Sequence, residues 1–83
     1  MNKIIVVVKM WFDSVNGNTY HRVKLFFNNT ILDSGVVYGY ETQYIETARK
    51  VYKDSTPFDG NRSEFYALSE FEVINVNKKE LYK

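Results

Sequence analysis

The chain has 83 residues, of which eleven are Lys or Arg, ten are Asp or Glu, one is His and none is Cys. Its length predicts a single domain over residues 1–83, because two separate hydrophobic cores need a longer chain. The lack of Cys excludes disulfides, thiolate metal sites and cysteine nucleophiles. The formal net charge is +1. Proteins that track or mimic nucleic acid typically carry a marked excess of one sign of charge, which this chain does not have.

The most apolar stretch of the chain, residues 4–8, ends at Lys9. It is too short for a bilayer span or for the core of a signal peptide, so we expect a soluble protein of the cytoplasm. A zinc site built around the single His would need several carboxylates as its other ligands. We therefore expect no metal site and no cofactor.

The first half of the chain predicts a meander of three antiparallel strands, at residues 3–12, 19–27 and 30–38. Asn16-Gly17 marks the first turn, and because the connection exceeds two residues we expect a longer loop or a bulge there. Asn28-Asn29 marks the second turn, and Gly35 is a candidate bulge in the third strand. The first strand is apolar almost throughout, which predicts a central place in the sheet.

The second half of the chain predicts one long helix and one more strand. Residues 41–53 carry an apolar stripe at helical spacing, formed by Tyr44, Ala48, Val51 and Tyr52. Asn61 and Glu64 resemble a capping box, which favours a short second helix at residues 63–68. The alternative is an irregular approach to the last strand, which we expect at residues 71–76.

These elements predict an α+β fold of the order β-β-β-α-β, in which an antiparallel sheet carries the main helix on one face. Alternation along the second strand places His21 on the face that the helix covers. The opposite face is expected to stay uncovered, and residues 78–83 are interpreted as a charged tail. On the open face the second strand presents a mixture of aromatic and basic side chains, namely Tyr20, Arg22, Lys24 and Phe26.

The sequence does not indicate a set of catalytic groups. His21 falls on the core side of its strand, which favours a structural role, and a general base would need an acidic partner or a nucleophile beside it. Acidic pairs such as Glu64 and Glu70 have no cleft to share in so small a domain, and we interpret them as solvated surface. We therefore expect that the protein is not an enzyme.

Two groups of residues are candidates for binding. The first is the open face of the second strand, where alternating aromatic and basic side chains suit a protein contact, single-stranded nucleic acid or plain solvation. The second is a group of tyrosines around Gly39, for which the alternatives are core packing or an anion held at the start of the helix. The candidate binding residues are Tyr20, Arg22, Lys24 and Tyr40.

Three segments, at residues 16–23, 38–48 and 73–81, resemble a group of small uncharacterised proteins from bacteriophages and prophages. In that group a GNTYH or GNSYH turn and strand is followed by a YGY segment that leads into a helix, and a basic V..KK.L segment follows later. The group often has a further glycine where this chain has Glu41. The resemblance implies a phage origin, and it implies no particular chemistry.

The resemblance and the lack of catalytic groups together favour a non-enzymatic, phage-encoded binding protein. The leading hypothesis is an inhibitor of a host defence system, similar to anti-CRISPR proteins, that occludes a host protein or ribonucleoprotein complex in the host cytoplasm. One alternative is a phage accessory protein that binds nucleic acid, and another is a sponge for a small nucleotide signal. An exposed sheet face or strand edge would also suit a homodimer.

Overall fold

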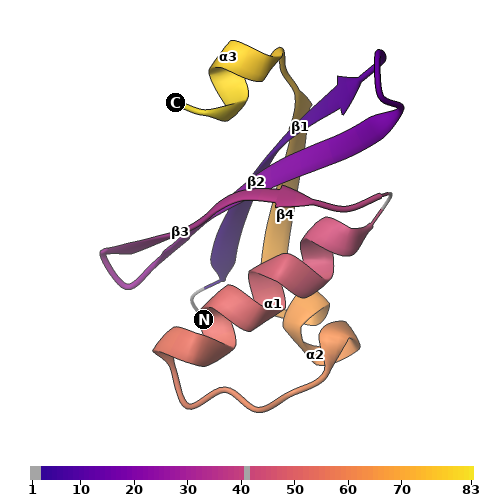
Figure 1. The fold of residues 1–83 in the computed structure, drawn as a ribbon. Coiled ribbons are helices and arrows are strands. Elements are labelled where there is room, and N and C mark those ends of the chain that lie inside the picture. Colours follow the sequence, from indigo (N-terminus) through magenta and orange to yellow (C-terminus); the bar gives the residue numbers. More distant parts are fainter. Residues whose placement is uncertain (1–2, 41) are drawn as a thin grey trace.

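The computed structural model describes residues 3–40 and 42–83. The strands are β1 (Ile4–Asp13), β2 (Asn18–Phe27), β3 (Thr30–Tyr38) and β4 (Ser69–Asn75), and the helices are α1 (Gln43–Ser55), α2 (Arg62–Ala67) and α3 (Lys78–Leu81). The predicted α+β class and the short helix before the last strand are confirmed (Figure 1). The predicted start of the long helix, residue 41, lies outside the described residues. No helix in the described ranges is long and apolar enough to cross a membrane.

The strand order is β3-β2-β1-β4, so β1 has the interior place that its apolar sequence predicts. The two hairpins make β1 antiparallel to β2 and β2 antiparallel to β3, as expected. β4 runs parallel to β1, with Ser69 opposite Ile4, so the sheet is mixed rather than wholly antiparallel. The reason lies in the connection, because α1 and α2 carry the chain back along one face to the end of the sheet where β1 starts.

Both hairpin turns use residues that tolerate positive φ angles. Residues 14–17 join β1 to β2, and Gly17 within them has a φ of +69°. Asn28 and Asn29 join β2 to β3 with φ angles of 46° and 61°, a conformation that Asn adopts more readily than most residues. The predicted turns, including the longer first loop, are therefore confirmed.

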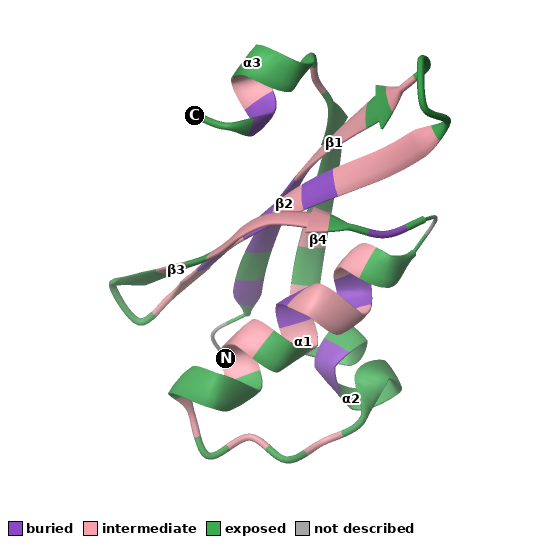
Figure 2. Cartoon of the chain, in the orientation of Figure 1, coloured by how far each residue is buried: buried purple, intermediate pink, exposed green. Residues whose placement is uncertain are grey.

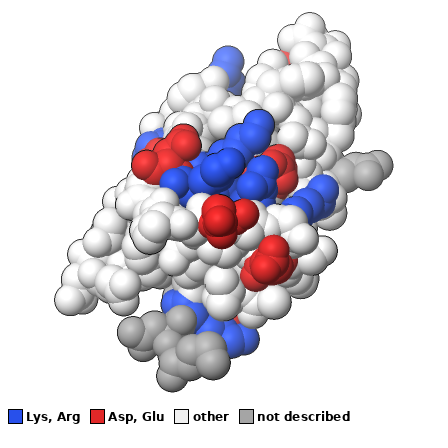
Figure 3. All heavy atoms as spheres, turned by 90° about the horizontal axis from the view of Figure 1, so that it is seen from below, with Lys and Arg blue, Asp and Glu red and all other residues white. Residues whose placement is uncertain are grey.

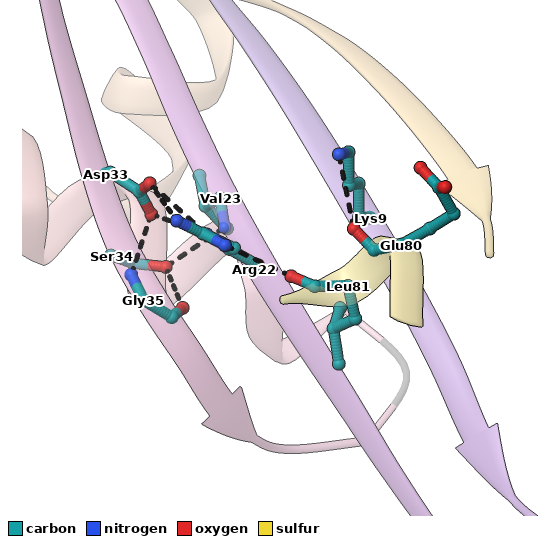
Figure 4. A network of polar contacts seen from close by, with 8 residues as sticks. All are labelled: Lys9, Arg22, Val23, Asp33, Ser34, Gly35, Glu80 and Leu81. Atoms are coloured by element: carbon teal, nitrogen blue, oxygen red, sulfur yellow. Dashed lines mark hydrogen bonds and ion pairs between the residues drawn. The ribbon is translucent and has the colours of Figure 1, made fainter. Parts of the chain in front are cut away.

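A β-bulge interrupts β3 at Gly35, as predicted. The register shifts there because two residues of β3 lie opposite Val23 of β2. Gly35 has a φ of +73°, and its N–H donates to a carboxylate oxygen of Asp33 at 2.8 Å. The N–H of Val23 donates to the hydroxyl oxygen of Ser34 at 3.0 Å, in place of a backbone carbonyl (Figure 4). Side chains of the bulge thus satisfy the backbone groups that the bulge unpairs.

The hydrophobic core lies between the sheet and the pair α1 and α2 (Figure 2). Its buried members are Ile4, Val6, Val8, Val23, Leu25, Ala48 and Phe65. Ala48 comes from the predicted apolar stripe of α1, and the other members of that stripe pack around the core. The predicted capping box opens α2, where Asn61 Oδ1 accepts the Glu64 N–H at 2.9 Å and Glu64 Oε1 accepts the Asn61 N–H at 2.9 Å.

The opposite face of the sheet is partly covered, because residues 78–81 form α3 (Figure 1). Leu81 of this helix is fully buried. Two basic side chains of the sheet donate to carbonyl oxygens at the C-terminal end of α3. Lys9 donates to Glu80 at 3.3 Å and Arg22 donates to Leu81 at 3.2 Å (Figure 4). The prediction of a charged tail and an uncovered face is wrong at this end of the sheet, because one Leu among charged residues forms no helical pattern.

Candidate binding surface

Four aromatic side chains form a continuous row across the sheet face that carries α3. The strand register places Trp11 of β1 opposite Tyr20 of β2, and Tyr20 opposite Tyr38 of β3. The ring centroids lie 5.6 Å apart in both pairs. Tyr40 extends the row beyond β3, with its ring centroid 5.3 Å from that of Tyr38 and its hydroxyl oxygen accepting a hydrogen bond from Tyr38 at 2.6 Å. We refer to Trp11, Tyr20, Tyr38 and Tyr40 as the aromatic row.

The rings of the aromatic row are packed against one another. Trp11 and Tyr20 stack with an interplanar angle of 19°, and Lys78 Nζ lies over Trp11, 5.8 Å from the ring centroid. Tyr20 with Tyr38, and Tyr38 with Tyr40, meet edge to face at 63° and 74°. Tyr38 and Tyr40 are the most exposed members, at 51% and 50%. The stacking contact and the Lys78 ammonium group thus occupy ring faces of Trp11 and Tyr20, and the exposed part of the row lies at Tyr38 and Tyr40.

Two of the four candidate residues, Tyr20 and Tyr40, belong to the aromatic row. Lys24 lies further along β2 on the same face. Trp11 and Tyr38 lie outside the predicted set, because alternation within one strand does not show which residues of the neighbouring strands lie beside it. The signal that would have found Trp11 is the length of the first hairpin loop, which decides which residue of β1 faces Tyr20.

Arg22, the fourth candidate, is bound within the chain. Its Nε and Nη2 atoms donate to the carboxylate oxygens of Asp33 at 3.0 Å and 2.6 Å, and its Nη1 atom donates to the carbonyl of Leu81 (Figure 4). The hydrogen bonds from Arg22 lower the pKa of the Asp33 carboxyl below its ordinary value. A bidentate ion pair of this kind fixes the position of the guanidinium group. Arg22 thus ties together β2, the bulge of β3 and α3.

The tyrosines around Gly39 separate onto the two faces of the sheet. Tyr38 and Tyr40 join the aromatic row, whereas Tyr44 packs against the core. A Cβ atom on Gly39 would come within 3.0 Å of the His21 ring. A larger residue at this position would therefore displace either the His21 ring or the backbone of residue 39. The glycine is therefore explained by close packing at the junction between β3 and α1.

His21 is fully buried on the core side of β2, as predicted. Its Nε2 atom lies 2.7 Å from Thr47 Oγ1, while the Thr47 hydroxyl donates to the carbonyl of Gln43 at 3.3 Å. Which of these two atoms donates is set by the imidazole tautomer. Nδ1 has no hydrogen-bond partner in the described part of the chain. These contacts tie β2 to the first turns of α1.

Acidification is expected to destabilise the protein through His21. Burial lowers the pKa of His21 below the ordinary value of 6.5, and the backbone of Gly39 opposes this shift. The unfolded chain therefore binds the proton more readily than the folded chain. The contribution of this neutral, buried His to stability is complete above about pH 6.5 and is lost progressively as the pH falls below that value.

Urea unfolding at about pH 7.5 and about pH 5.5 measures this loss. His21→Gln, which cannot titrate, is the control, and we expect its stability to change much less between the two conditions. Asp33 has a lowered pKa and contributes only at more acidic pH, so it does not disturb this window. An equal pH dependence in the two proteins would contradict the assignment to His21.

Charged side chains are mixed on the surface below α1 and α2. In the view from below, basic side chains at the centre are flanked by acidic ones (Figure 3). Glu46 and Arg49 of α1 form an ion pair of this kind.

In residues 3–40 and 42–83, no group of three or more His, Cys, Asp or Glu side chains is arranged to hold a metal ion.

No protein-family model, curated protein or solved structure matches this chain.

Proposed function

We propose that this protein is a non-enzymatic binding protein that covers a surface of another macromolecule with its aromatic row. The observation that carries the proposal is the exposure of Tyr38 and Tyr40 at the end of a packed aromatic series. Tyr and Trp are the residues most enriched at energetic hot spots of protein interfaces. The hydrogen bond to Tyr40 raises the pKa of the Tyr38 hydroxyl, so the Tyr38 hydroxyl stays protonated at neutral pH.

A protein partner fits the aromatic row better than nucleic acid. Bases bind to aromatic side chains by stacking on open ring faces. In the row, Trp11 and Tyr20 already stack on each other, and the next contacts are edge to face. Arg22, the nearest guanidinium on β2, is neutralised by Asp33. A surface of packed aromatic rings and hydroxyls with few free charges is typical of the centre of a protein interface.

The resemblance to phage and prophage proteins supports a partner in the infected bacterium. In that setting, the proposed role is inhibition of a host defence system by occlusion of one of its proteins or ribonucleoprotein complexes, as anti-CRISPR proteins do. The origin and the target class rest on the resemblance, whereas the binding surface rests on the aromatic row. The two parts of the proposal can be tested separately.

Replacing Tyr38 and Tyr40 together with alanine is expected to abolish capture of the partner. Tagged protein is expressed in infected bacteria, and the retained molecules are compared by mass spectrometry. Loss of these two rings removes the most exposed part of the proposed interface, so we expect the recovery of the specific partner to fall at least about tenfold. Circular dichroism checks that the variant still folds.

Tyr66→Ala is the matched control for this experiment. Tyr66 is exposed to a similar extent, 55%, and also contacts another aromatic ring, but it lies on α2 at the opposite face of the sheet. Its variant is expected to capture the partner as the unchanged protein does. If the double variant captures the partner as well as the unchanged protein does, the proposal is wrong. Retention of nucleic acid that falls steeply with salt would favour the nucleic-acid alternative instead.

A further inference from the structure

The two outer strands of the sheet differ in how their edges are protected. β3 carries the bulge at Gly35, and the side chains of Asp33 and Ser34 already bond to backbone groups there. Bulges of this kind discourage pairing with another strand. β4 has neither a bulge nor a proline, and its register with β1 is continuous from Ser69 to Asn75. In the described part of the chain, no strand lies on the outer side of β4.

The hydrogen bonds at the two ends of β4 show which backbone groups point outward. The N–H of Ile4 donates to the carbonyl of Leu68 at 3.1 Å, and the N–H of Val76 donates to the carbonyl of Met10 at 2.8 Å. In a parallel ladder, alternate residues of a strand face its neighbour. The even-numbered residues of β4 therefore bond to β1, and the outward backbone groups belong to Ser69, Phe71, Val73 and Asn75.

Apolar side chains flank this free edge on both faces of the sheet. Val73 is 43% exposed and Ile74 is 38% exposed, and the two point to opposite faces. Glu70 and Glu72 share the face of Ile74 and are exposed as well. An occupant of this edge must supply backbone groups in the same spacing and apolar side chains on both faces, which is what another β-strand does.

We propose that β4 pairs with β4 of a second copy of this chain, in the antiparallel sense, about a two-fold axis at Val73. The longest overlap would place the axis at Glu72, but it would bring two carboxylates directly opposite each other, which is destabilising. With the axis at Val73, Glu72 faces the partner's Ile74, and Phe71 faces the partner's Asn75. No like charges are opposed in this register.

A second copy supplies both the backbone groups and the apolar side chains that this edge needs. Val73 meets its own equivalent on one face, and each Ile74 covers the aliphatic part of a Glu side chain on the other. The net charge of +1 per chain adds little repulsion between copies. The result is one continuous sheet of eight strands, twice the four of a single chain. This association is independent of the binding function proposed above, since the aromatic row lies at the other strands.

Single cysteines test both the interface and its register, because the chain has no Cys of its own. Residues opposite each other in a hydrogen-bonded antiparallel pair have Cα atoms about 5.5 Å apart, which a disulfide can span. Val73→Cys is expected to form a covalent dimer on mild oxidation. Ile74→Cys, a neighbour of similar exposure, is expected to stay uncrosslinked alone and to crosslink when mixed with Glu72→Cys. A homodimer of Glu72→Cys would overturn the proposed register.

Sedimentation equilibrium tests the association without any crosslink. The unchanged protein is expected to be a dimer, and Val73→Lys is expected to be a monomer, because two ammonium groups would face each other at the axis. Ile31→Lys is the control, since Ile31 is exposed on β3, at the other edge of the sheet, and its variant is expected to remain a dimer. A monomeric unchanged protein, or a dimeric Val73→Lys, would overturn the proposal.

Discussion

Replacing Phe65 with alanine is expected to lower the free energy of unfolding by about 3–5 kcal/mol. Phe65 is fully buried, and the ring centroids of Tyr52, Phe58 and Phe71 lie 5.6, 6.1 and 6.2 Å from its own. These neighbours come from α1, the loop before α2 and β4, so the ring joins three segments to α2. An alanine leaves a cavity that no single segment can close by a small shift.

A loss of this size is decisive for a domain of this length, which is expected to have about 4–12 kcal/mol of stability in total. Urea unfolding followed by circular dichroism measures it. Tyr66→Ala, in the next position of the same helix, is the control, and because its side chain is exposed we expect it to cost much less. If Phe65→Ala costs less than about 1 kcal/mol, α2 is not anchored by this ring.

Replacing Leu81 with alanine is expected to release α3 from the sheet. Leu81 is the fully buried side chain of a helix with one turn, and such a helix has little stability of its own. A buried Leu→Ala change costs about 2–5 kcal/mol, but here the loss cannot exceed the free energy that docks α3. The rest of the sheet is expected to stay folded, and Lys9 and Arg22 lose their carbonyl partners.

Amide hydrogen exchange distinguishes this local release from global unfolding. The amides of residues 80–83 are expected to lose protection, while those of β1 and β2 keep most of theirs. Tyr82→Ala, an exposed neighbour, is the control and is expected to leave both regions unchanged. Uniform loss of protection over the whole chain would show that α3 is an integral part of the core.

The elements that could be predicted from the sequence are those with local signals. Alternation in β2, the helical stripe in α1 and the capping box at Asn61 each need only a few neighbouring residues. The pairing of β4 with β1 brings Ile4 opposite Ser69, and no short pattern indicates whether such distant segments run parallel. The sequence does not indicate α3 for a similar reason, since Leu81 becomes informative only when the sheet beneath it is known.

The candidate surface was found in part for the same physical reason. Tyr20 stands out within its own strand, but the row that it joins depends on the register of three strands. Arg22 looks like a free basic residue in the sequence, and its partners Asp33 and Leu81 are far away along the chain. Local alternation therefore identifies which side chains of β2 share a face, and only the assembled sheet identifies which of them are available.

The parallel pairing of β1 with β4 also has a consequence for how the chain folds during synthesis. β1 can form its hairpin with β2 early, but its other side has no partner until β4 has left the ribosome. Residues 4–8 are apolar and all β-branched, a composition that favours aggregation when a strand edge is exposed. Any interruption of synthesis before β4 emerges therefore leaves this edge of β1 exposed.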